Sequence, residues 1–412
     1  MIKVLKPYLV QEKKQNIYFI ITLLLTFFLP LYKISSSPFL ILSSIIIILE
    51  ILFSKGKILS SFFKQKINIF FLIFYLLAGF SLLYSKNLNH GFNQLNKLLP
   101  LLIFPLWFLV WKATNTQIVL ILKTFIFACI LAFLLSLGSQ FWNILTHNNY
   151  SFYYIQFIDI LWMHPTYLSL YLNFAIFISY YLYTKKHLSL AQFAFCSLIF
   201  ISFILMLLAR MQILLMFLVL IIISIHFLKQ NFSFKILFFC FISLFATLFI
   251  ISQNQQLKNR FVYAKNIQYN FENLNDKNWN GVNVRLAIWK SAFSTIKENV
   301  FFGAGIGDED DVLFESYKNN NFKFAYNLKY VAHNQYIQIL LGLGVLGFIV
   351  YLFMYFLLIK NAFLNNDFLL FALIILLFFT GFTESFLRLQ SGIIFFAYFI
   401  CLLVYKNSLR ED

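Results

Sequence analysis

Long apolar runs constrain the fold of this chain more than any other feature. Residues 335–359, for example, contain no charged side chain. The hydrocarbon core of a bilayer is about 30 Å thick, so about 17 to 25 apolar residues cross it as a helix that pairs its own backbone polar groups. Such runs recur along the chain, which is 61% hydrophobic and only 11% charged. We therefore predict an all-α fold, a polytopic transmembrane helix bundle.

About twelve runs qualify as spans, with ends that sequence alone defines to within a few residues. They are residues 16–34, 38–53, 67–85, 95–111, 116–145, 165–183, 190–209, 211–228, 235–252, 335–359, 367–383 and 391–405. The first run follows several lysines, but it is too long for a signal-peptide core and no small-residue cleavage site follows it. We expect it to be retained.

Lysines in the short loops predict which ends of the spans face the cytoplasm. They lie in alternate loops on the side of the N-terminus: Lys55, Lys57, Lys64 and Lys66, then Lys185 and Lys186, then Lys229 and Lys235. Basic loop residues mark the cytoplasmic side, so we expect both termini inside and residues 253–334 outside. The net charge of +17 then reflects this bias and contact with anionic membrane lipids, and no nucleic-acid partner is expected.

The predicted organisation has three parts. Residues 1–252 carry nine spans, residues 253–334 form one large outer loop, and residues 335–412 carry three spans and a short cytoplasmic tail. In residues 253–334 the apolar content falls while Asn, Lys and Asp become frequent. A loop of this length is usually functional, so we expect it to contribute to the site.

Within that loop, "NVRLAIWKSAFSTIKEN" predicts an amphipathic helix that begins near Asn283, a good capping residue. Apolar residues recur at steps of three and four, and Arg285 stands at the head of this stripe. Lys290, Ser294 and Lys297 fall on another face. We expect the helix to lie at the outer membrane surface or against the bundle.

Arginine is rare here, and its positions are informative. The chain has 32 basic residues, and only five are arginines. Four of them, Arg210, Arg260, Arg285 and Arg388, map to the outer side. A guanidinium is a planar, permanently charged fork that binds phosphate or carboxylate through two bonds, so these positions mark candidate anion contacts.

The arginines also have simpler interpretations. Arg210 lies between two spans with no polar turn around it. It either contacts an anionic ligand or is a structural residue, whose side chain reaches the lipid headgroups or pairs with an acid. Arg285 is either a functional residue or an interfacial anchor. For Arg388 we favour pairing with Glu384, four residues earlier, over substrate binding.

Two histidines precede outer ends of spans. His333 suits a general base, because a neutral imidazole accepts a proton near neutral pH. The adjacent Asn334 suits a residue that orients a hydroxyl of the substrate. The alternative is a helix cap or a surface hydrogen bond. His164 is a second candidate for substrate binding, although an entry turn set by Pro165 explains it more simply.

The stretch "FFGAGIGDEDD" (301–311) is interpreted as a flexible turn. It has three glycines, but no strand precedes them and acids follow, so a phosphate cradle is not indicated. The run from Asp308 to Asp311 is more typical of a solvated face than of a metal site. Neither a metal nor a cofactor is expected. Gly342, Gly344 and Gly347 are expected to permit close helix packing.

Four motifs occur in an order that resembles a known family. They are "VRLAIW" (284–289), "FFGAGIG" (301–307), "HNQYIQILLGLGVLG" (333–347) and "TES" (383–385). Together with the span count and the large outer loop, they resemble the O-antigen ligases and O-antigen polymerases, most clearly over residues 280–390. The resemblance implies a multi-pass protein of the bacterial inner membrane that transfers a glycan from undecaprenyl diphosphate at the periplasmic face, without a metal.

Carried onto this sequence, the resemblance implies that Arg210 and Arg285 contact the donor diphosphate and that His333 is the histidine of the active site. The implied partners are an undecaprenyl-diphosphate-linked glycan and a glycolipid or glycan acceptor. A ligase acting on lipid A core, a repeat-unit polymerase and a protein-glycosylating ligase remain alternatives. A lipid-linked-glycan transporter is a further alternative, and a protein of that class is expected to carry ionisable groups near mid-membrane. A purely structural protein explains neither Arg210 nor Arg285.

Overall fold

The computed structural model describes residues 2–32, 36–54, 56–146, 150–230, 279 and 281–408. Within these ranges every regular element is a helix, which confirms the all-α class. The elements are α1 (Ile2–Phe28), α2 (Ser36–Phe53), α3 (Lys57–Lys64), α4 (Lys66–Ser81), α5 (Leu88–Leu98), α6 (Pro100–Val110), α7 (Asn115–Thr146), α8 (Tyr154–Phe157), η1 (Asp159–Leu161), α9 (Pro165–Thr184), α10 (Leu190–Leu207), α11 (Arg210–Gln230), α14 (Gly281–Ile296), α15 (Glu309–Asn319), α16 (Lys323–Asn327), α17 (Gln335–Leu364), α18 (Phe368–Gly381), η3 (Phe386–Arg388) and α19 (Gln390–Ser408).

The predicted apolar runs coincide with helices wherever the structure describes them. They correspond to α1, α2, α4, α6, α7, α9, α10, α11, α17, α18 and α19, and only the run 235–252 lies outside the described residues. In the described residues, five helices are long and apolar enough to cross a membrane, or up to six if the bent pair α2–α3 forms one span. Four more apolar segments are shorter. The count of twelve spans remains a prediction.

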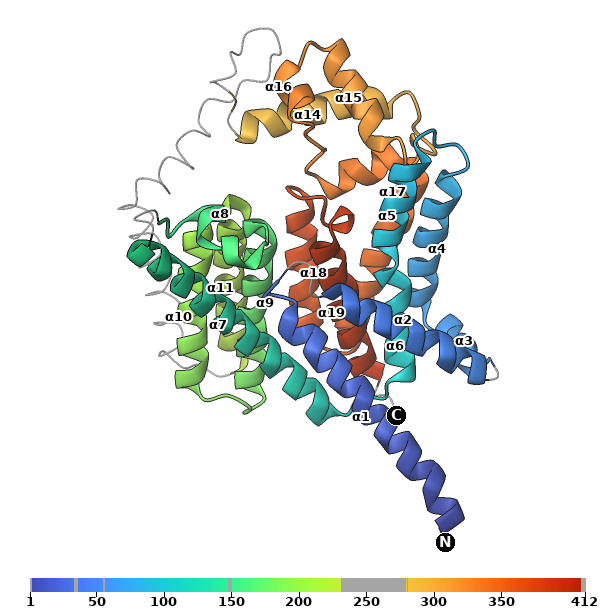
Figure 1. Cartoon of the computed structure of the whole chain (residues 1–412), viewed down its shortest axis with the longest axis vertical. Helices are drawn as coiled ribbons and strands as arrows, with labels where there is room; N and C mark the ends of the chain where they lie inside the picture. Colours follow the sequence, from blue (N-terminus) through green and yellow to red (C-terminus); the bar gives the residue numbers. More distant parts are fainter. Residues whose placement is uncertain are drawn as a thin grey trace.

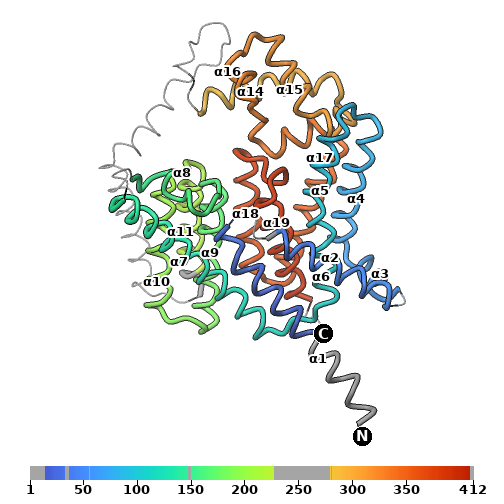
Figure 2. Tube along the Cα trace, in the orientation of Figure 1, coloured from blue at the N-terminus to red at the C-terminus, as the bar shows by residue number. Residues whose placement is uncertain are grey.

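The helices are arranged in a bundle with a separate layer at one end. Figures 1 and 2 show α14, α15 and α16 together at that end, while α19 finishes at the opposite end. α9 is buried along almost its whole length, and so is α19. A helix that is apolar on every side belongs in the interior, so α9 and α19 form the axis around which the other helices pack.

A small second core holds the end layer together. It is formed by buried residues of α14, α15, α16 and the start of α17, among them Ile288, Leu313, Tyr317, Ala325 and Ile337. Burying apolar side chains stabilises a helical layer that is too short to be stable alone. The described part of the predicted outer loop, residue 279 and residues 281–334, is therefore a folded unit.

α14 differs from the prediction in its start and in its buried face. It begins at Gly281, and Asn283 is buried inside the helix instead of capping it. The side chain of Phe293, predicted to lie in the apolar stripe, is 50% exposed. The buried face is formed by Val284, Ala287, Ile288, Ser291, Ala292 and Ile296. The buried face of α14 is rotated relative to the predicted apolar stripe because the helix packs on α15 and α17.

α17 is interrupted at Gly344, whose backbone has φ of 61° and is not helical. The loop after α14 fills this break. Ala304 and Gly305 donate backbone N–H bonds to Leu341 and Gly342, at 2.7 and 2.9 Å, and Val345 donates to Val300 at 2.8 Å. These bonds satisfy the backbone groups that the break releases, as an apolar environment requires.

The glycine-rich segment 301–307 is therefore tightly packed and is not the flexible turn that we predicted. A Cβ atom on Gly303 would lie 2.6 Å from backbone atoms of Gly342 and Gly344. Gly342 and Gly344 are closely packed, but against this loop and its neighbours and not against another helix as we predicted.

Candidate functional site

A cavity of about 620 Å³ is lined by residues of the end layer and of the neighbouring helices. Four of the six predicted site residues line it: His164, Arg210, Arg285 and His333. They come from the turn before α9, the start of α11, the first turns of α14 and the loop before α17. Glu384, in the loop after α18, is a fifth ionisable group in the lining.

Four helices begin at this cavity. His164 and Thr166 are at the start of α9, Ala209 and Arg210 at the start of α11, Gly281 at the start of α14, and His333 just before α17. Unpaired N–H groups at a helix N-terminus carry partial positive charge, and they favour anions. The residue before α11 is an alanine, which has no side-chain oxygen to cap that helix. The arrangement is therefore suited to a negatively charged ligand.

Arg285 and His333 are both held near the carboxylate of Glu384. Arg285 Nη2 lies 3.6 Å from Glu384 Oε1, and His333 Nδ1 lies 3.9 Å from Glu384 Oε2. Arg285 Nη1 also donates to the carbonyl of Gly281, at 3.3 Å. Arg285 Nε is buried, and no described residue accepts a hydrogen bond from it.

Glu384 is deeply buried, with a side chain that is 8% exposed. Burial alone would raise the pKa of this carboxyl. Interaction with His333, and then the charge of Arg285, outweigh the burial and hold the pKa below its ordinary value. Glu384 is therefore ionised at neutral pH. Our prediction that it pairs with Arg388 is wrong, because the intervening residues form η3 and an irregular turn.

His333 is fixed by its neighbours in the chain. Its φ of 46° lies in the left-handed region, which is strained for a residue with a side chain. Trp289 Nε1 donates to the carbonyl of Ala332 at 3.0 Å. Asn334 N donates to Ser385 Oγ at 3.2 Å, which joins the histidine segment to the Glu384 segment.

Asn334 itself does not line the cavity. Its Oδ1 accepts from the backbone N–H groups of Tyr336 and Ile337, at 3.0 and 3.1 Å, and its Nδ2 donates to the carbonyl of Phe382 at 3.2 Å. The side chain thus caps α17 and fixes it to the end of α18. The geometry gives Asn334 a positioning role next to His333, and the substrate contact that we predicted for it stays a prediction.

Arg210 stands at the first position of α11, and a buried polar triad holds that helix end. Asn173 Nδ2 donates to the carbonyl and the Oε1 of Gln212, at 3.0 and 3.1 Å. Gln212 Nε2 in turn donates to Thr380 Oγ1 at 3.0 Å. All three side chains are fully buried. The triad connects α9, α11 and α18 directly below the cavity.

His164 lines the cavity while it caps α9. Its Nδ1 accepts from the backbone N–H of Thr166 at 3.3 Å, and Pro165 is the first residue of the helix. The entry turn that we favoured for this histidine is confirmed, and its imidazole is also at the cavity wall.

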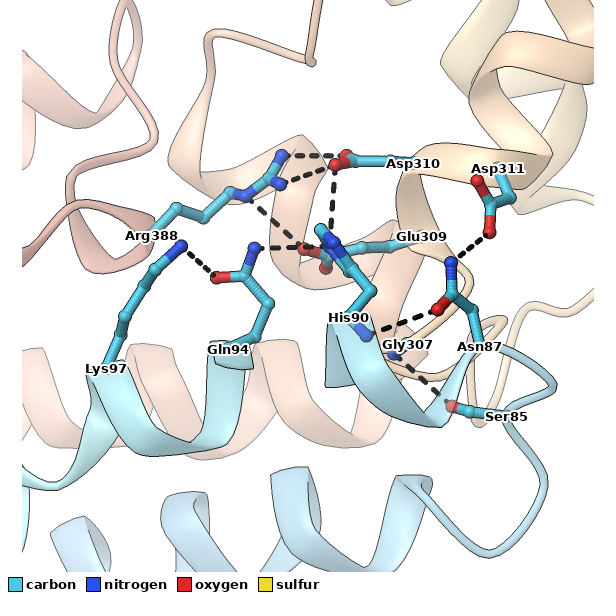
Figure 3. A network of polar contacts seen from close by, with 10 residues as sticks. All are labelled: Ser85, Asn87, His90, Gln94, Lys97, Gly307, Glu309, Asp310, Asp311 and Arg388. Carbon is cyan, nitrogen blue, oxygen red and sulfur yellow. Dashed lines mark hydrogen bonds and ion pairs between the residues drawn. The ribbon is translucent and has the colours of Figure 1, made fainter. Parts of the chain in front are cut away.

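Arg388 lies outside the cavity in a buried ionic network. Its Nη1 and Nη2 donate to the two oxygens of Asp310, at 2.7 and 2.5 Å, and its Nε lies 3.5 Å from Glu309 Oε1 (Figure 3). Both nitrogens of the fork are occupied by one carboxylate, which is the strongest geometry for such a pair. The structure therefore places Arg388 in the scaffold, and its role as a substrate contact, the less favoured interpretation, stays a prediction.

The acidic run also differs from the solvated face that we predicted. Asp308, Glu309 and Asp310 are each at most 9% exposed. Asp308 accepts the backbone N–H groups of Lys86 and Asn87, both at 2.7 Å, and His90 Nε2 lies 3.5 Å from Asp310. In the part of the chain that the structure describes, no group of His, Cys, Asp and Glu is arranged to hold a metal ion. The run anchors α15 to the turn before α5 (Figure 3).

Comparison with known families adds an independent finding. Residues 194–352 match the model of a family described as O-antigen ligase. The matched region contains Arg210, Arg285 and His333, and it ends within α17. No curated protein matches the chain. The match confirms the resemblance that the four sequence motifs indicate.

Proposed function

Because residues 194–352 match the O-antigen ligase family, we propose that this chain is a membrane glycosyltransferase that moves a glycan from an undecaprenyl diphosphate donor to lipid A core. We place it in the bacterial inner membrane, with the cavity facing the periplasm. The observation that carries the proposal is the convergence of two arginines, two histidines and four helix N-termini on one cavity.

The donor diphosphate binds at Arg210 and Arg285 in this proposal. Each guanidinium offers paired donors to phosphate oxygens, and Arg285 keeps one buried donor that no described residue uses. The helix N-termini add partial positive charge on the same side. Negative charge grows on the diphosphate as it leaves the sugar, so preorganised donors stabilise the transition state more than the ground state.

His333 acts as the general base. Its Nδ1 faces Glu384, at 3.9 Å, so Nε2 is the nitrogen available to the acceptor. An acceptor hydroxyl gives its proton to Nε2 while its oxygen forms a bond to the anomeric carbon. The bond from that carbon to the diphosphate breaks, the diphosphate keeps the electron pair, and the sugar inverts. Glu384 stabilises the imidazolium that forms.

A repeat-unit polymerase of the same family would use identical chemistry with a different acceptor. The surface glycolipids of a deletion strain discriminate the two. Free polymer that accumulates on its lipid carrier supports the ligase. Lipid A core capped with a single repeat unit supports the polymerase.

Transfer by the purified full-length chain in proteoliposomes tests the site itself. Arg285→Ala and His333→Ala should each abolish transfer from a synthetic undecaprenyl-diphosphate glycan to lipid A core, with unchanged thermal unfolding. Lys318→Gln, an exposed change on α15, serves as the control and should retain transfer. Full transfer by both site variants would refute the assignment.

A further inference from the structure

A second hollow of about 560 Å³ runs along α14, next to the cavity. Its lining consists of Leu286, Trp289, Lys290, Phe293, Ser294 and Lys297, and we call it the α14 groove. Leu286 and Trp289 line the cavity as well. The two hollows are therefore neighbours that share these two side chains.

The chemistry of the α14 groove fits an anionic saccharide. Lys290 lies on α14 and Lys297 directly follows its last residue, and both present ammonium groups, which bind phosphate and carboxylate. Between them Phe293 exposes half of its side chain, and an aromatic ring packs against the apolar face of a sugar.

The position of the groove points to the acceptor. Trp289, at the junction of the two hollows, donates its indole N–H to the carbonyl of Ala332 at 3.0 Å. Ala332 directly precedes His333, so the wall that the groove shares with the cavity lies near the proposed base. The acceptor is the substrate whose hydroxyl must reach that base, whereas the donor diphosphate binds the arginines.

We propose that the α14 groove binds the phosphorylated saccharide of the acceptor glycolipid through Lys290, Lys297 and Phe293. This inference rests on the proposed function and adds the place where the acceptor docks and the charge that it carries. It predicts that the acceptor's phosphates contribute to KM and leave the chemical step unchanged.

The test compares acceptors with and without phosphate in nanodiscs made of phosphatidylcholine. For Lys290→Gln/Lys297→Gln, the KM for phosphorylated lipid A core should rise about tenfold, because two ammonium–phosphate contacts are lost. The KM for enzymatically dephosphorylated lipid A core, the KM for the donor and kcat should stay unchanged. Phe293→Ala should raise the KM for both acceptors.

The double variant Lys318→Gln/Lys323→Gln is the matched control. It removes the same charge from exposed positions of the end layer that line neither hollow, and it should behave as wild type. The inference is overturned if the two double variants give equal KM values, or if the donor KM rises instead. It is also overturned if Lys290 and Lys297 matter only in vesicles with phosphatidylglycerol, which would indicate membrane contact. Absence of transfer by the wild type would refute the proposed function and the inference together.

Discussion

Arg285 Nη2 lies 3.6 Å from Glu384 Oε1, although the two residues belong to α14 and to the loop after α18. The same carboxylate faces His333 with its second oxygen. One buried acid thus aligns the proposed diphosphate ligand and the proposed base. This arrangement makes Glu384 as important to the site as the residues that we propose to contact the substrate.

Replacement of Glu384 by Gln should lower kcat by about 10- to 100-fold, because the imidazolium of His333 loses its counter-charge and Arg285 loses its anchor. Glu384→Asp should recover part of the rate. The measurement is transfer in proteoliposomes at saturating donor and acceptor. A Gln variant with wild-type kcat would show that the carboxylate has no part in the reaction.

Replacement of Gln212 by Leu should destabilise the protein by about 1 to 3 kcal/mol, since buried polar groups of Asn173 and Thr380 lose a partner. The start of α11 should shift, and the KM for the donor should rise because Arg210 moves with it. Thermal unfolding and donor kinetics are the measurements. Ile221→Val, on the exposed face of α11, is the control and should change neither.

Replacement of Arg388 by Met should cost about 3 to 5 kcal/mol of stability, because Asp310 and Glu309 are left as buried charges without their partner. Adding Asp310→Asn should recover part of the loss, and the double-mutant cycle gives the coupling between the two residues. Equal unfolding temperatures for Arg388→Met and wild type would contradict the scaffold role.

Glu309 should make stability depend on pH near neutrality. Burial raises the pKa of Glu309 to about 7, against the opposing charge of Arg388. A carboxyl that binds its proton more tightly in the folded state contributes stability below its unfolded pKa, and this contribution is lost as pH rises through about 7. Asp310, Arg388 and Lys97 are the charged neighbours.

Glu309→Gln removes this titration. The unfolding temperature of the variant minus that of wild type should therefore increase between pH 5 and pH 8, with thermal unfolding as the measurement. A difference that stays constant across this range would show that Glu309 keeps one protonation state throughout.

The sequence alone determined the helices. Wherever the structure describes a predicted apolar run, a helix is present, because hydrocarbon or a protein interior leaves backbone groups no other partner. The placement of Arg210 at a helix start and of His333 before α17 was also predictable, since both follow from where apolar runs begin.

Only the tertiary structure decided which charges meet. Spacing in the sequence favoured a pair between Glu384 and Arg388, yet each binds a residue from a distant segment. Likewise, the rotated face of α14 and the break at Gly344 depend on the segments that pack there. Helix formation depends on local spacing, whereas ion pairs and packed faces depend on distances that only the complete fold sets.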